Sequence, residues 1–250
     1  MRSTGFYIRQ KLQWRGRTHK EGVETAAPQW EPTTDRGRQL LKKYPLHEQH
    51  SELTLRESLG HLDLLDRFQT PIPDFSHAVE VGVKNWRYLP GLAAWLKKSF
   101  KAAKNPRKLI GVEVDAYRLD RRGCSYFETG SYFADQQTSV DLRFEYQALD
   151  FKKFHQPVDL LFWFFPLVCS STHKSWGLPK ELFRPRDLFH HAADLLKPQS
   201  GFIVVNQGDW EWEESWHYLK SSFDLKEQHV VKGSLHPSDH PIVSTLLIRK

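Results

Sequence analysis

The sequence is poor in cysteine and in long apolar runs. Its 250 residues include only Cys124 and Cys169, so neither a disulfide framework nor a cysteine-rich zinc site is available, which favours a reducing, cytoplasmic location. The most apolar stretch, residues 158–168, is interrupted by Asp159 and is much shorter than the roughly 18 residues of a membrane span. We therefore expect a protein that needs no disulfides and does not cross a membrane.

Motifs of several common enzyme classes are missing too. The chain has no Gly-x-x-x-x-Gly-Lys-[Ser/Thr] phosphate loop and no Gly-x-Ser-x-Gly nucleophile elbow. A nicotinamide-dependent oxidoreductase would need Gly-x-Gly-x-x-Gly after its first strand, where only Gly82 is found. His190 and His191 are adjacent on a predicted helix and point about 100° apart, so we expect no metal there. His236 and His240 fall in a predicted turn, which we expect to be exposed.

Positive charge is concentrated near the N-terminus. Residues 1–43 hold ten Lys and Arg against four Asp and Glu, a difference that equals the whole net charge of +6. A mildly basic surface with a basic tail explains this balance, and attraction to nucleic acid is the alternative. Residues 1–32 show no sustained period and contain three glycines and two prolines, so we expect an irregular basic arm, through which any nucleic acid would bind.

Helical and strand patterns fill the rest of the chain. Helical periodicity over 33–43 and 51–68, the latter with Ser51 as N-cap, predicts a helical extension at 33–70. Strand patterns then cover 77–83, 108–114, 140–149, 158–165, 201–206, 226–235 and 242–249, and helical patterns cover 88–103, 186–196 and 211–223. The stretch 116–139 lacks a clear period. The alternation predicts an α/β protein with a doubly wound, mostly parallel seven-stranded sheet that ends in an antiparallel strand pair.

Acidic residues recur where the predicted strands end. Glu80 stands two residues before Gly82 at the end of the first strand, Glu113 closes the second, and Asp150 follows the third. In doubly wound sheets, ligands bind outside the carboxyl ends of the strands. A carboxylate after the second strand can accept both ribose hydroxyls of a nucleoside, and one after the third can accept an adenine amino group. The order of the acids therefore predicts a nucleoside site, with Asp115 as the competing ribose acid.

This arrangement resembles the class I S-adenosylmethionine-dependent methyltransferases over roughly residues 75–250. The resemblance implies a Rossmann-like methyltransferase domain at 71–250, S-adenosylmethionine as cofactor, and the cofactor-binding residues Glu80, Gly82, Asn85, Glu113, Asp150, Phe151 and Phe164. In this set Glu113 would bind the ribose and Asp150 the adenine amino group, with Phe151 beside the ring. Phe164 would lie near the transferred methyl group.

Two positions depart from the family's pattern. Where the family spaces glycines as Gly-x-Gly-x-Gly, this chain has Gly-Val-Lys-Asn-Trp from Gly82 on, which keeps the loop farther from a cofactor unless Asn85 supplies a left-handed turn. The alternative is a purely structural turn with Trp86 in the core. The Asn/Asp-Pro-Pro-aromatic motif of many amino-group methyltransferases is also absent, because Phe164 and Phe165 precede Pro166 without an amide or acid.

The sequence thus predicts an S-adenosylmethionine-dependent methyltransferase and does not define its acceptor. His173, His155 and Asp209 follow predicted strands and are candidate bases, none of them distinguished as catalytic. The alternative function is a non-catalytic module of the same fold that binds a partner such as RNA, because two of the loop glycines and the motif acid are missing.

Overall fold

Seven strands form one sheet in the order β3-β2-β1-β4-β5-β7-β6. The structure is a computed structural model that describes residues 2–13, 31–46, 50–100 and 105–250. The strands are β1 (His77–Val81), β2 (Arg107–Glu113), β3 (Leu142–Ala148), β4 (Val158–Phe164), β5 (Leu196–Gln207), β6 (Phe223–Val231) and β7 (Ile242–Arg249). β3, β2, β1, β4 and β5 run parallel, and β7 is antiparallel to β5 and β6. The predicted doubly wound sheet with an antiparallel C-terminal pair is confirmed.

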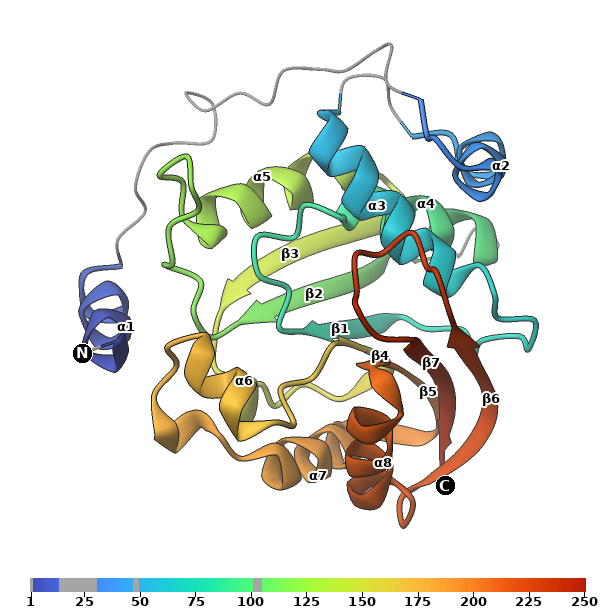
Figure 1. Cartoon of the computed structure of the whole chain (residues 1–250). Coiled ribbons are helices and arrows are strands. Elements are labelled where there is room, and N and C mark those ends of the chain that lie inside the picture. Colours follow the sequence, from blue (N-terminus) through green and yellow to red (C-terminus); the bar gives the residue numbers. More distant parts are fainter. Residues whose placement is uncertain (1, 14–30, 47–49, 101–104) are drawn as a thin grey trace.

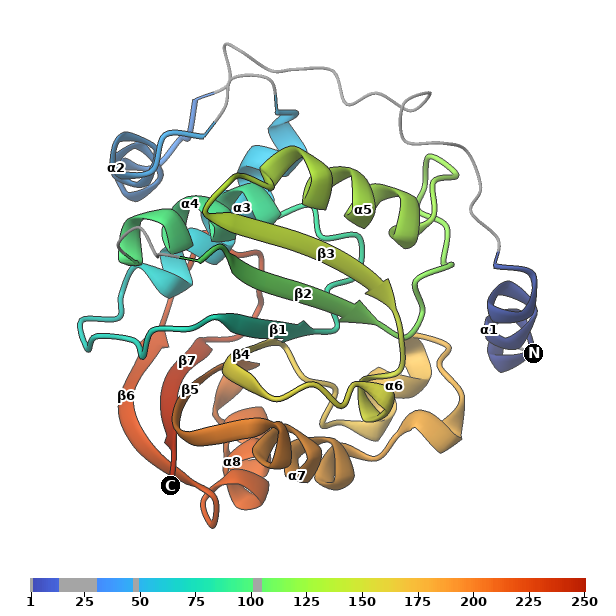
Figure 2. The ribbon, with the colours of Figure 1, turned by 180° about the vertical axis from the view of Figure 1, so that it is seen from behind.

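Helices cover both faces of this sheet (Figure 1, Figure 2). The α-helices of the described residues are α1 (Arg2–Leu12), α2 (Asp35–Lys43), α3 (Glu52–Leu65), α4 (Leu89–Ser99), α5 (Tyr126–Gln137), α6 (Ser170–Ser175), α7 (Pro185–Leu195) and α8 (Gly208–Leu219). α3, α4 and α5 lie on one face, α7 and α8 on the other. In β4, fully buried Phe162 belongs to the first core and Leu161 to the second. Because both faces are covered, the strand is a continuous apolar run, which is why its sequence predicts it.

Among the residues that the structure describes, no helix combines the length and the apolar character that crossing a membrane requires. Several element boundaries differ from the prediction. β5 begins at Leu196 and not at residue 201; the prediction misses this start because residues 197–199 are exposed and include a proline, which hides the strand pattern. The aperiodic stretch 116–139 contains α5, whose N-cap Ser125 accepts a hydrogen bond from Glu128 N at 3.1 Å. Ser51 caps α3 as predicted.

The expectation of an irregular arm over 1–32 is wrong for residues 2–12, which form α1. This helix is held by groups far away in sequence: Arg9 pairs with Asp115 at 2.9 Å, and Gln10 Nε2 donates to Val114 O at 2.8 Å. Phe6 is buried as well. Local periodicity does not report such tertiary contacts, so the sequence alone does not reveal the helix. Residues 14–30 of the predicted arm lie outside the described residues, and the division of the chain into three parts stays a prediction.

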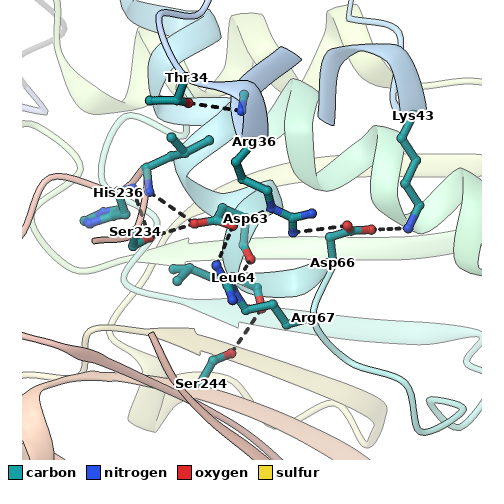
Figure 3. Close-up of polar contacts among 12 residues, drawn as sticks. Thr34, Arg36, Lys43, Asp63, Leu64, Asp66, Arg67, Ser234, His236 and Ser244 are labelled. Carbon is teal, nitrogen blue, oxygen red and sulfur yellow. Dashed lines mark hydrogen bonds and ion pairs between the residues drawn. The ribbon is translucent and has the colours of Figure 1, made fainter. Parts of the chain in front are cut away.

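Asp63 of α3 ties the N-terminal helices to the loop between β6 and β7 (Figure 3). One carboxylate oxygen accepts from Arg36 Nε of α2 and from Arg67 Nη2, both at 2.9 Å. The other accepts from Ser234 Oγ at 3.2 Å and from Leu235 N at 3.1 Å. Asp63 is only 1% exposed. Burial opposes its ionisation, but the hydrogen bonds and charges of these partners hold the pKa of Asp63 below its usual value.

We expect Asp63→Ala to lower the unfolding free energy by about 2–4 kcal/mol, because two guanidinium groups and the Leu235 N–H lose a buried acceptor. Urea-induced unfolding measures this loss. Since folding lowers the pKa of Asp63, the stabilisation is present above the unfolded pKa and should vanish as the pH falls through the folded pKa. The matched control is Asp35→Ala, an 88% exposed partner of Arg38, which should lose less than about 1 kcal/mol. Equal losses in both variants would contradict the role assigned to Asp63.

Candidate functional site

A cavity of about 280 Å³ opens at the carboxyl ends of β1, β2 and β4. It lies where the strand order reverses between β1 and β4, the position at which doubly wound sheets bind ligands. Its walls come from residues in the segments 81–84, 112–118, 149–151, 163–168, 172–189, 207–211 and 236–237. Five of the seven predicted cofactor residues line it: Gly82, Glu113, Asp150, Phe151 and Phe164. Glu80 and Asn85 are not among the lining residues.

Glu80 does not line the cavity but stabilises the turn that follows β1. Its side chain is fully buried and accepts a hydrogen bond from Trp86 Nε1 at 2.8 Å and another from the Tyr88 hydroxyl. Burial raises the pKa of Glu80 to about 7, although both hydrogen bonds favour the ionised form. Trp86 is itself fully buried in the core, as the structural interpretation of this turn expected.

The loop after β1 has a left-handed backbone at three alternating positions. φ is +76° at Gly82, +52° at Lys84 and +49° at Trp86. These are the positions that the family's pattern gives to glycine, and the expectation that Asn85 takes the left-handed conformation is wrong. A non-glycine residue there costs about 1–2 kcal/mol. Fixed contacts offset that cost: Lys84 N donates to Glu113 Oε2 at 2.9 Å, and Lys84 O accepts from the Tyr146 hydroxyl at 2.6 Å.

Glu113 closes β2 and joins two loops of the cavity. Its Oε2 accepts from Lys84 N, and its Oε1 accepts from Asp115 N at 2.8 Å. The side chain is 7% exposed, and burial raises the pKa of Glu113 against the effect of these two N–H groups. A carboxylate offers about four acceptor positions, so each oxygen can accept one further hydrogen bond from a ligand.

Asp115, the competing ribose acid, lines the same cavity but is held by two arginines. Arg9 Nη2 lies 2.9 and 3.0 Å from its two oxygens, and Arg118 Nε lies 2.6 Å from one of them. The ion pair with Arg9 brings α1 to the edge of the cavity, beyond the carboxyl ends of the strands (Figure 1). Glu113, whose partners are backbone N–H groups, is therefore the less occupied of the two acids.

Asp150 and Phe151 form the wall beyond β3. Asp150 Oδ1 accepts from Lys152 N at 3.1 Å, which caps a single turn of 3₁₀ helix, Phe151–Lys153. Its other oxygen pairs with Arg184. The buried Phe151 ring packs edge-on against Trp163, with 5.8 Å between the ring centroids. The two aromatic rings make this wall apolar, and the Asp150 carboxylate is the polar group beside them.

Phe164 and His236 form the opposite wall. The ring centroids of Phe164 and His61 of α3 lie 4.9 Å apart, and those of His236 and Phe165 lie 4.5 Å apart. His240 is exposed as expected, but the expectation is wrong for His236, which is half-buried. Asp63 holds the loop of His236 against α3, where a Cβ at Gly60 would be only 3.0 Å from His236 Cα. Burial and the nearby charge of Lys84 lower the pKa of His236 to about 4.

The candidate bases divide between cavity and surface. His173 lines the cavity and is buried, which lowers its pKa. His155 and Asp209 are exposed and do not line the cavity. Sequence reasoning missed His236 and Lys84 as cavity residues. For Lys84 a signal was present, a cation at a position where the family's pattern has glycine, whereas His236 is placed by contacts with α3 that no local pattern reports.

No protein-family model matches the sequence, and no curated protein matches it. Solved structures do match. An S-adenosylmethionine-dependent methyltransferase from Aquifex aeolicus has a TM-score of 0.50 at 14% identity, covering 78% of this chain and 93% of that one. A methyltransferase from Pyrococcus furiosus has a TM-score of 0.50 at 14% identity, covering 76% and 82%. The magnesium protoporphyrin IX methyltransferase from Synechocystis, with bound S-adenosylmethionine, has a TM-score of 0.50 at 10% identity, covering 86% and 90%. The chain has the class I methyltransferase fold.

We expect the buried Glu80 to make the protein less stable as the pH rises. Its pKa is raised from 4.5 to about 7 on folding, so the folded state binds the proton more tightly and the unfolding free energy should fall between these two pH values. Glu80→Gln keeps an acceptor for Trp86 and should remove this part of the pH dependence. Urea unfolding of both proteins between about pH 5 and pH 8 isolates Glu80, since all other titrating groups are shared. Parallel pH profiles would refute the assignment.

Proposed function

We propose that this chain binds S-adenosylmethionine in the cavity and transfers its methyl group to an acceptor bound beside Phe164 and His236. The observation that carries the proposal is the convergence of Gly82, Glu113 and Asp150, which follow or close three neighbouring strands, on a single cavity. The fold gives independent support, because the Synechocystis enzyme that shares it holds S-adenosylmethionine.

The residues present fit this cofactor. A Cβ added at Gly82 would meet no atom within 4 Å, so the backbone at the start of the loop is open to a ligand. Glu113 has acceptor capacity for the ribose hydroxyls, and Asp150 for the adenine amino group. Phe151 and the partly buried Leu149 supply apolar surface for the purine ring. In this proposal Glu80 and Asn85 shape the loop and do not contact the cofactor.

When bound, S-adenosylmethionine supplies a methyl group on a positively charged sulfur. The chain's own contribution is to orient the acceptor and exclude water, for which the aromatic wall of Phe164 and Phe165 is suited. With a pKa of about 4, His236 is neutral at physiological pH and can accept a hydrogen bond from an acceptor N–H or O–H group. The wall has no amide or acid at 164–166, so we infer that the amide-and-proline mechanism of many amino-group methyltransferases is not used.

The second candidate function is a non-catalytic module of this fold that binds a partner such as RNA. It is favoured by the same apolar segment 164–166 and by the basic N-terminal residues. One of these cations, Arg9, is already neutralised by Asp115, which weakens the case for α1 as a nucleic-acid contact. Failure of the folded protein to bind S-adenosylhomocysteine at millimolar concentration would favour this candidate.

We expect S-adenosylhomocysteine to bind the parent protein and to bind Glu113→Gln about 10- to 100-fold more weakly, because a charged acceptor for the ribose is lost. Asp150→Asn should weaken binding less, about 3- to 10-fold, since an amide oxygen still accepts a hydrogen bond. Isothermal titration calorimetry measures all three affinities. Glu145→Gln is the matched control, because Glu145 pairs with Lys108 on the surface of the sheet and lies outside the cavity.

Thermal unfolding of each variant checks that the loops joined by Glu113 are intact. If a folded Glu113→Gln bound S-adenosylhomocysteine as tightly as Glu145→Gln, the ribose assignment would be wrong. Unchanged binding by Asp150→Asn would speak only against the adenine contact.

A further inference from the structure

Lys84 is a cation in the cavity for which the described residues provide no ion-pair partner. Three cationic side chains line the cavity among the described residues, Lys84, Arg118 and Arg184. Arg118 pairs with Asp115 and Arg184 with Asp150. Lys84 forms no ion pair with any carboxylate in the part of the chain that the structure describes. The residue is solvent-exposed, so an anion that enters the cavity can pair with its ammonium group.

The two carboxylates whose charges act most on Lys84 have other partners. Glu57 and Glu113 both attract Lys84, but Glu113 accepts from backbone N–H groups and Glu57 faces Arg87 at 3.7 Å. The Lys84 ammonium lies 4.4 Å from the centroid of the Trp176 ring, a cation–π contact that orients it without neutralising it.

The backbone at Lys84 supports a role for its side chain. Its φ of +52° is a conformation that glycine adopts without strain, and the family's pattern has glycine at this position. A lysine that is kept in a strained conformation at the rim of a cavity is a candidate for function. The neighbouring Gly82 leaves open space, so a ligand that lies along this loop meets the Lys84 side chain at its next left-handed position.

We propose that Lys84 binds the carboxylate of the methionine part of S-adenosylmethionine, the only anionic group of that molecule. This inference rests on the proposed function. Lys84 thereby supplies through a side chain the attraction that a loop of three glycines would have to supply through closely approaching backbone N–H groups.

The experiment compares two ligands that differ only in this carboxylate, S-adenosylhomocysteine and its decarboxylated analogue, by calorimetry on the full chain. The parent should bind S-adenosylhomocysteine at least about 10-fold more tightly than the analogue. Lys84→Gln should lose about 10- to 100-fold in affinity for S-adenosylhomocysteine and keep its affinity for the analogue within about 3-fold, so that the preference disappears. Lys84→Arg should retain most of the preference.

Two further variants separate charge from loop shape. Lys84→Gly relieves the left-handed strain and should raise the unfolding temperature while it lowers the affinity for S-adenosylhomocysteine as Lys84→Gln does. If loop shape alone mattered, Lys84→Gly would bind at least as tightly as the parent, and the proposal would fall. Lys97→Gln, an exposed lysine on α4, controls for the general loss of one positive charge and should bind like the parent.

The outcomes distinguish this inference from the proposed function. If the parent binds both ligands and Lys84→Gln binds S-adenosylhomocysteine as the parent does, the assignment of Lys84 is overturned and the methyltransferase proposal stands. An equal loss for both ligands in Lys84→Gln overturns it too, because the carboxylate is then not what Lys84 contacts. If the folded parent binds neither ligand, both proposals fail.

Discussion

The cavity depends on the carboxylate of Glu113. It sits at the end of β2 and accepts backbone N–H groups from the loop after β1 and from the turn after β2. Glu113 thereby holds the two loops at a fixed distance from each other. It also stabilises the left-handed backbone of the first loop, which is unfavourable for Lys84 and Trp86. An apolar residue at 113 would leave both N–H groups unsatisfied. The same oxygen atoms retain capacity for a ligand, so structural and binding roles coincide in one group.

Much of the fold could be predicted from the sequence because parallel strands covered on both faces are apolar along their whole length. β1, β2 and β4 follow this rule and were placed within a few residues. β5 was shortened in the prediction because its first part is exposed, and α1 was missed because its partners, Asp115 and Val114, lie more than a hundred residues away. The hydrophobic pattern of a segment indicates which of its residues are buried, but it does not indicate a contact that one side chain makes with a residue distant in sequence.

The candidate site was predictable to the extent that topology defines it. Acids that close neighbouring parallel strands must meet at one edge, so Glu113 and Asp150 could be identified without a structure, and both line the cavity. The directions in which the side chains point could not be predicted. Glu80 faces the core and Asn85 is not the left-handed residue of its loop, while Lys84 and His236 face the cavity. Glu80 is turned inward by hydrogen bonds from Trp86 and Tyr88, six and eight residues further along the chain, in a turn without periodicity. Lys84 and His236 are placed by contacts between segments distant in sequence, and such contacts leave no periodic trace.

The link between Asp63 and the β6–β7 loop also bears on how the molecule assembles. Asp63 and Ser234 are separated by 171 positions. Contacts between residues so far apart in sequence raise the entropic cost of loop closure and slow folding. At a synthesis rate of roughly 5–20 residues per second, α3 waits on the order of 10–30 s for its partner loop. During that interval α3 can pack against elements that are made earlier than the loop, among them α2 and α4. The side of the cavity that His236 lines can therefore form only after the segments of β1 to β4 have been synthesised.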